Sequence, residues 1–158
     1  MFILVRAVTY ATLFVALVLM FLPARVLSRS GVIAPETMGL RQIAGIVVAA
    51  VGAALAFWCV LTFAFVGRGT PAPFDPPRRL VVEGPYRLVR NPMYSGAGLA
   101  LGGVALFYHS WMLLAYVGLF WLATHLFVLW YEEPALRRTF GKEYETYCGR
   151  VRRWWPKP

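Results

Sequence analysis

Four long apolar runs constrain the fold of this chain more than any other feature of its sequence. They cover Phe2–Leu22, Ile43–Val66, Pro92–Tyr108 and Trp111–Tyr131. A helix needs about 20 apolar residues to cross a bilayer, with a working range of about 17–25. Three runs meet this length easily, and the third is at its lower limit. We therefore predict an all-α integral membrane protein with about four transmembrane helices.

The whole chain is predicted to form one membrane domain, residues 1–158. The first two helices occupy residues 1–66. A helical hairpin and a C-terminal segment occupy residues 80–158, because only His109 and Ser110 separate the third run from the fourth. The first run is longer than the apolar region of a signal peptide, which has about 7–15 residues. We therefore expect it to remain as a span.

The distribution of basic residues predicts the orientation. With four spans, 13 of the 16 Lys and Arg residues lie on one side of the membrane, and Arg25, Arg29 and Arg41 lie on the other. Because the positive-inside rule makes the richer side cytoplasmic, we expect both termini to face the cytoplasm. Such flanking charges also attract anionic lipid. They account for the net charge of +9 without a nucleic-acid partner.

Two polar segments are predicted on the cytoplasmic side. Gly67–Pro77 is rich in proline and glycine, which favours an extended loop. After Pro134, apolar residues recur at three- and four-residue spacing as far as Val151, which predicts one amphipathic helix on the membrane surface. Trp154 and Trp155 follow it among basic residues, a pattern typical of an interfacial anchor.

A basic loop, Gly84–Gly96, reads GPYRLVRNPMYSG and leads directly into the third apolar run. Its Arg87 and Arg90 precede Pro92, a residue that suits the first turn of a helix. The free N–H groups at the start of a helix, together with these arginines, would suit a carboxylate or a phosphate. The alternative is that both arginines only follow the positive-inside rule.

Two adjacent acids, Glu132 and Glu133, stand where the fourth run ends. The hairpin returns them to the membrane surface that holds the basic loop. The positive-inside rule does not require acids at this place, so they are candidates to hold an ammonium group or another cation. The alternative is an internal ion pair with Arg87, Arg90 or Arg137.

Three residues within the predicted spans have two interpretations each. His125 is ionisable, and such a residue inside a span is a candidate for function, although a neutral histidine can also hydrogen-bond across the bundle. Gly96 and Gly98 let helices pack closely, or they leave room for a ligand against the backbone. With two histidines and no spaced cysteines, the sequence offers no metal cluster.

The order of these features resembles a known family. GPYRLVRNPMYSG, a helical hairpin and EEPALRRTFGKEYETYCGRV are similar to the isoprenylcysteine carboxyl methyltransferase and phospholipid methyltransferase superfamily. The resemblance covers about Leu80–Pro158. The family's Arg-His-Pro-x-Tyr appears here at Arg90 to Tyr94, with Asn91 in place of the histidine. Its Arg-Val-Pro appears as Arg-Val-Arg, starting at Arg150.

The resemblance implies an integral membrane methyltransferase that uses S-adenosylmethionine and acts on a lipid or isoprenyl-linked acceptor in the bilayer. It places the active site at the cytoplasmic surface, between the last two helices and the C-terminal segment. The residues implied in cofactor binding are Tyr86, Arg90, Asn91, Pro92, Tyr94, Gly96, Gly98, Glu132, Glu133, Tyr144 and Tyr147. The residues implied in catalysis, as a base or in orienting the acceptor, are Glu132, His125, Arg137 and Arg150.

The resemblance points first to an isoprenylcysteine carboxylate as the acceptor, with a phosphatidylethanolamine-type amine as the alternative. A carboxylate needs no base, whereas an ammonium group must first lose a proton. Two other functions stay open: a sterol-type reductase that uses NADPH, which is usually longer, and a non-enzymatic lipid-binding membrane protein, which would leave the paired charged clusters unexplained. The oligomeric state stays open as well.

Overall fold

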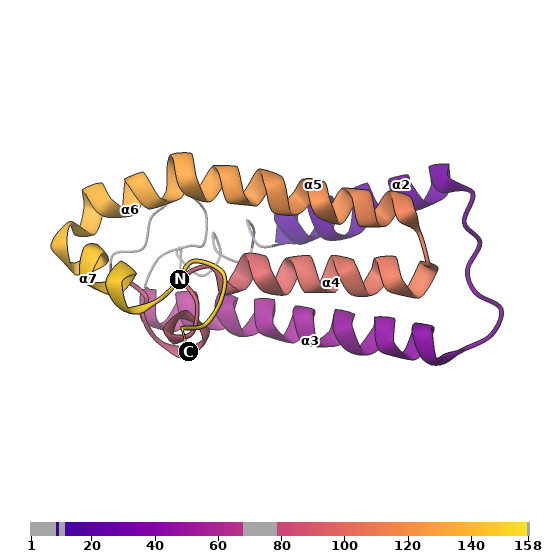
Figure 1. Cartoon of the computed structure of the whole chain (residues 1–158), viewed down its shortest axis with the longest axis horizontal. Helices are drawn as coiled ribbons and strands as arrows, with labels where there is room; N and C mark the ends of the chain where they lie inside the picture. The colour runs from indigo at the N-terminus through magenta and orange to yellow at the C-terminus, as the bar shows by residue number, and fades with distance from the viewer. Residues whose placement is uncertain (1–8, 10–11, 68–78, 158) are drawn as a thin grey trace.

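The computed structural model describes residues 9, 12–67 and 79–157 (Figure 1). These residues form helices joined by loops, and no strand occurs among them, so the predicted all-α class is confirmed. The α-helices are α2 (Leu22–Ser30), α3 (Leu40–Thr62), α4 (Pro92–Tyr108), α5 (Trp111–Phe127), α6 (Glu133–Phe140) and α7 (Lys142–Arg150). Three of them are extended by π-helical segments: Val15–Phe21 leads into α2, Phe63–Gly67 follows α3, and Val128–Glu132 follows α5.

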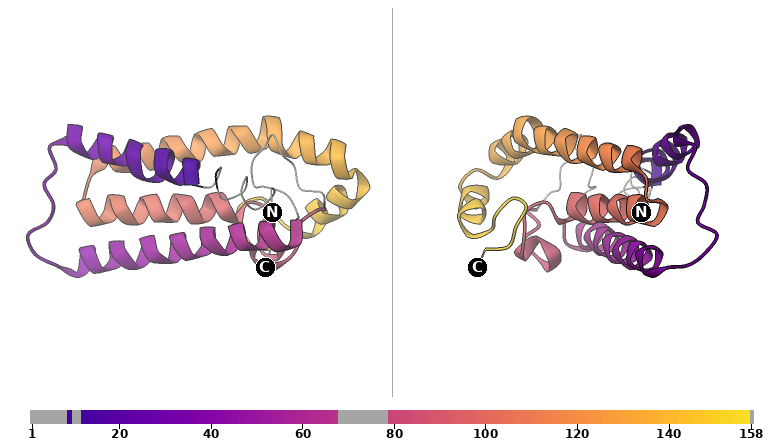
Figure 2. Two further views of the ribbon diagram at one scale, coloured as in Figure 1. Left: turned by 180° about the vertical axis from the view of Figure 1, so that it is seen from behind. Right: turned by 45° about the vertical axis from the view of Figure 1, so that its right-hand side comes forward.

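Within the described residues, three helices are long and apolar enough to cross a membrane: Thr12–Ser30, Leu40–Thr62 and Trp111–Phe140. α4 has 17 residues, which is the lower limit for a span, and it lies alongside α3 in all views (Figures 1 and 2). The predicted count of about four spans therefore rests on α4. The 30-residue helix is about 45 Å long, so one end extends beyond a hydrocarbon core of about 30 Å.

The N-terminal helix continues beyond the predicted boundary at Leu22 and ends at Ser30. Pro23 does not break it, because this residue stands in the first turn of α2, after a π-helical segment. The helix stops at Gly31, whose φ of 67° is left-handed. Much of the predicted run before residue 12 and most of the predicted Gly67–Pro77 loop lie outside the described residues.

α3 and α4 pack with their backbones in close approach at pairs of glycines. A Cβ atom added at Gly103 would lie 2.3 Å from the backbone nitrogen of Ala49, and one added at Gly96 would lie 2.7 Å from the backbone oxygen of Gly52. These distances are far below ordinary van der Waals contact, so only glycine fits. Gly45 meets the backbone of α4 in the same way. Small residues thus permit close helix contact, as is usual in membranes.

These contacts bear on the two interpretations of Gly96 and Gly98. The space beside Gly96 is filled by the backbone of α3, and the space beside Gly98 is filled by the indole of Trp121, 2.7 Å from an added Cβ, so neither glycine leaves room for a ligand. Gly103 packs against α3, but a Cβ on Gly102 would meet no described atom within 4 Å.

The predicted single amphipathic helix after Pro134 is wrong. The chain breaks at Gly141, with φ 51° and ψ −124°, and this conformation separates α6 from α7. Because glycine reaches positive φ at little cost, α7 turns back toward the segment that precedes α4 (Figures 1 and 2). This reversal brings the C-terminal segment, residues 151–157, to the basic loop.

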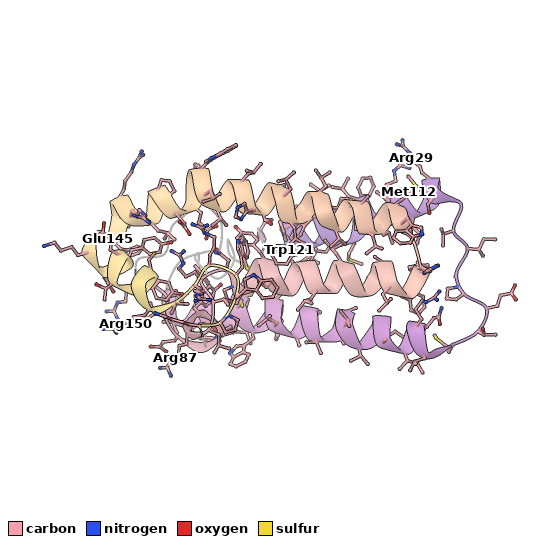
Figure 3. The ribbon with its side chains drawn as sticks, in the orientation of Figure 1. Arg29, Arg87, Met112, Trp121, Glu145 and Arg150 are labelled. Atoms are coloured by element: carbon pink, nitrogen blue, oxygen red, sulfur yellow. The ribbon has the colours of Figure 1, made fainter. Side chains whose placement is uncertain are left out.

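The two ends of the helical bundle differ in composition. Arg87, Glu145 and Arg150 lie at the end where α7 turns back, and Arg29 and Met112 lie at the opposite end (Figure 3). The hairpin therefore places the basic loop and both acids at one end, as the sequence predicts. The candidate site lies at this end.

Candidate functional site

The C-terminal segment is held against the basic loop by backbone pairing. Arg90 N–H donates to the carbonyl of Arg152 at 2.9 Å, and Val89 and Arg152 form an isolated parallel bridge. Asn91 donates twice to the carbonyl of Arg153, from its backbone N–H and from Nδ2, each at 3.3 Å. Asn91 thus stands where the family has histidine and ties the start of α4 to the C-terminal segment.

Glu133 lies between two arginines, and the three side chains form what we name the Arg90–Glu133–Arg153 cluster. Arg153 donates from Nε to Oε1 at 2.7 Å and from Nη2 to Oε2 at 2.9 Å. Arg90 Nη2 reaches only Oε1, at 3.2 Å. The bidentate contact with Arg153 is the stronger geometry, and it raises the pKa of the Arg153 guanidinium above its usual value. The cluster carries a net charge of +1.

Arg90 retains donor capacity after these contacts. Its Nη1 donates to Sγ of Cys148. Its Nε is buried and has no hydrogen-bond partner among the described residues. An unsatisfied buried donor costs about 1–3 kcal/mol. A buried N–H of a guanidinium is well suited to donate a hydrogen bond to a carboxylate.

Glu132 has a different environment from Glu133. Its Oε2 accepts a hydrogen bond from the phenol of Tyr94 at 3.0 Å. Among the described residues it makes no ion pair. The two adjacent acids thus have different partners: two arginines contact Glu133, whereas the phenol of Tyr94 contacts Glu132.

Three buried tyrosines form the wall of the site. Tyr147 donates from its hydroxyl to the backbone carbonyl of Tyr86 at 2.6 Å, and the ring of Tyr86 packs edge-on against Phe63 at 5.3 Å between centroids. Tyr144 is only 2% exposed. Burial raises the pKa of all three phenols above the usual value, with Glu133 adding to the effect at Tyr144. They therefore remain neutral donors.

These side chains enclose a cavity of about 40 Å³. Its lining combines the basic loop, the two acids, α6, α7 and the end of the α3 helix; the lining residues are Phe63, Leu80, Val81, Tyr86, Arg90, Asn91, Glu132, Glu133, Leu136, Tyr144 and Tyr147. A cation, two carboxyl groups and aromatic walls thus meet in one place. This arrangement suits a ligand that carries both charges.

The raised phenol pKa values predict alkaline sensitivity. The folded chain holds these phenolic protons to higher pH than the unfolded chain does, so their stabilising effect is complete below about pH 10 and is lost as the pH rises above it. We expect the free energy of unfolding, measured by denaturant titration in detergent, to fall above about pH 10. Tyr147→Phe should flatten that fall, and a free energy that is constant to pH 11 would contradict this prediction.

Other predicted residues lie elsewhere. His125 accepts a hydrogen bond at Nδ1 from Trp154 at 3.0 Å, so this partner lies in the C-terminal segment and not on another helix of the bundle. Trp154 also packs against Trp121 at 5.2 Å, so this half of the expected Trp154–Trp155 anchor contacts protein. Arg137 and Arg150 are exposed on α6 and α7, and Pro92 is buried at the first turn of α4.

Arg153 and Phe63 contribute to the site although the sequence did not single them out. Arg153 lies among basic residues that the positive-inside rule already explains, and its pairing depends on the turn at Gly141. Phe63 ends an apolar run and has no sequence mark of its own.

The comparison with protein families identifies the family of this chain. The sequence model described as phospholipid methyltransferase matches residues 40–143, from the start of α3 into α7. No curated protein and no solved structure matches the chain. The family match covers more than half of the sequence and includes the basic loop, the hairpin and both acids. The chain therefore belongs to the phospholipid methyltransferase family and is a membrane methyltransferase that acts on a lipid.

Proposed function

We propose that the chain transfers a methyl group from S-adenosylmethionine to a membrane lipid at the cavity between the basic loop, α6 and α7. The observation that carries this proposal is the buried Nε–H of Arg90, which lacks a partner among the described residues although Arg90 lines the cavity. The amino-acid end of the cofactor bears a carboxylate that would accept this hydrogen bond. When bound, the cofactor supplies an electrophilic methyl group.

The residues of the cavity fit that cofactor in kind. Arg90 would bind its carboxylate, with Asn91 fixing the backbone at the start of α4, and Tyr86, Tyr144 and Tyr147 would offer apolar faces. The cavity of about 40 Å³ has room for a carboxylate-sized group and not for a nucleoside. The rest of the cofactor must therefore lie outside it or displace side chains that line it.

The orientation is part of the proposal. The end that holds the cavity also carries most of the basic residues, which supports a cytoplasmic site and cytoplasmic termini. We also treat the chain as one domain, because the N-terminal helix contacts the hairpin: Tyr116 donates from its hydroxyl to the carbonyl of Val18 at 2.8 Å. Arg137 and Arg150, exposed at this end, would attract an anionic lipid head group.

For the acceptor we propose an amine of a phospholipid head group. The family description supports it, and so does Glu132, which has no cationic partner among the described residues, because such a carboxylate attracts an ammonium group and repels an anionic acceptor. Glu132 could then take the proton that the amine must lose. This choice differs from the isoprenylcysteine carboxylate that the resemblance of the motifs put first.

Glu132→Gln tests this role of Glu132. The amide cannot take a proton, so kcat for an amine acceptor should fall by about 10²–10⁴-fold. Binding of S-adenosylhomocysteine, measured by titration calorimetry, should change far less. Glu145→Gln, on an exposed position of α7 (Figure 3), is the control and should leave both quantities unaltered. An unchanged kcat in Glu132→Gln would exclude it as the base.

The reaction itself is tested by a labelled methyl-transfer assay on membranes that contain the chain. We expect methyl label from S-adenosylmethionine to appear in a methylated phosphatidylethanolamine. If the label appears in an isoprenylcysteine ester instead, the proposal of an amine acceptor is overturned, but the assignment as a lipid methyltransferase stands. A cofactor that neither binds nor donates its methyl group would overturn the use of S-adenosylmethionine.

A further inference from the structure

The contacts of Glu133 raise a question about Arg90. Arg90 lines the cavity and its buried Nε–H has no partner among the described residues, yet its Nη2 lies 3.2 Å from a carboxylate that could neutralise it. An isolated arginine next to a buried glutamate would normally form a bidentate pair, with two parallel hydrogen bonds. In this structure Arg90 reaches Oε1 alone, while Arg153 donates to both oxygens of Glu133.

We propose that Arg153 is a positioning residue that occupies Glu133 and thereby leaves Arg90 free to bind the carboxylate of the ligand. This inference rests on the proposed function, and it assigns Glu133 the role of a shared counter-ion instead of a ligand contact. Arg153 acts only through Glu133 and Arg90, and it need not touch the ligand.

The charges of the cluster support this role. Two guanidiniums and one carboxylate leave one positive charge, which suits one carboxylate group of a ligand. Without the Arg153 side chain, Glu133 and Arg90 would together be neutral, and the attraction for an anion would disappear. Glu133 is 6% exposed, so water would screen the remaining pair only weakly.

The side chain of Arg153 can be changed without releasing the C-terminal segment. That segment is held by the carbonyls of Arg152 and Arg153, which accept hydrogen bonds from Arg90 and Asn91, and by Trp154 against His125. These contacts use the backbone or a neighbouring residue. Arg153→Gln should therefore fold, and its effect should arise from the charge.

The test measures the affinity of the full-length chain in detergent for S-adenosylhomocysteine by titration calorimetry. Arg153→Gln should bind about 10-fold to 100-fold more weakly, the factor that corresponds to the loss of a charged hydrogen bond. Adding Glu133→Gln should restore the affinity, because Arg90 no longer has a carboxylate to pair with. Arg152→Gln, next in the chain and exposed, is the matched control and should bind like the unaltered protein.

Even if Arg153→Gln alone does not fold, the positioning role of Arg153 can be tested by comparing Glu133→Gln with the double variant that carries both Arg153→Gln and Glu133→Gln. Arg153 should be dispensable once Glu133 is neutral, so the two affinities should agree within about threefold. A double variant that binds much more weakly than Glu133→Gln would overturn the inference, and so would loss of binding in Glu133→Gln itself. Absence of binding by the unaltered protein would instead reject the proposed cofactor.

Discussion

Arg90→Ala is expected to weaken the binding of S-adenosylhomocysteine by about 100-fold or more and to abolish methyl transfer at ordinary cofactor concentrations. Arg90 is a cation that lines the cavity, and its buried Nε–H has no partner in the part of the chain that the structure describes. Alanine removes this donor together with the positive charge. Titration calorimetry on the purified chain measures the first effect, and transfer of labelled methyl groups in membranes measures the second.

The fold should survive this substitution, because Glu133 keeps its bidentate contact with Arg153. Arg87→Ala is the matched control. Arg87 belongs to the same basic loop and has the same charge, but its side chain is exposed. Equal losses in both variants would mean that the loop acts through its overall charge, and an unchanged affinity in Arg90→Ala would remove Arg90 from the binding site.

The apolar pattern predicted the helices well where local signals mark both ends. α4 begins and ends at the predicted residues, since Pro92 suits a first turn and His109 adopts a left-handed conformation with φ 50°. It failed at two places where hydrophobicity carries no information. The N-terminal helix continues in polar sequence to Ser30, and Gly141 breaks a periodic pattern that is otherwise continuous.

The charged residues of the site could be predicted from the sequence, but the pairing of each acid with its partner could not. Opposite charges at the two ends of a hairpin must come near each other, so the meeting of Arg90 with the acids followed from the topology. Which acid pairs with which cation depends on side-chain contacts that arise after the chain reverses at Gly141. The sequence could not show that Tyr94 contacts Glu132 and that two arginines contact Glu133.

The site and the bundle also depend on each other through α4. Asn91, just before the first residue of α4, contacts the C-terminal segment, and Tyr94, in its first turn, contacts Glu132. The length of α4 is packed on α3 through glycines, so a displacement of α4 would move the start of the helix and the basic loop with it. Close packing in the membrane therefore fixes the geometry of a site that lies at its edge.

Gly103→Ala should destabilise the folded chain by about 1–3 kcal/mol or more, the usual cost of overpacking. The added Cβ would lie 2.3 Å from the backbone nitrogen of Ala49 and 2.6 Å from the backbone oxygen of Gly45. Backbone atoms cannot rotate away as a flexible side chain can, so α3 and α4 must separate. The measurement is the free energy of unfolding of the chain in mixed micelles, titrated with a denaturing detergent.

Gly102→Ala is the matched control, one residue earlier on the same helix. Its Cβ would meet no described atom within 4 Å, and alanine is the better helix former by about 1 kcal/mol. This variant should therefore be as stable as the unaltered chain or more stable. If the free energy of unfolding falls in Gly103→Ala and does not fall in Gly102→Ala, helix propensity cannot be the cause, because it changes equally at both positions. If both variants were equally stable, α3 and α4 would not be packed backbone to backbone at Gly103.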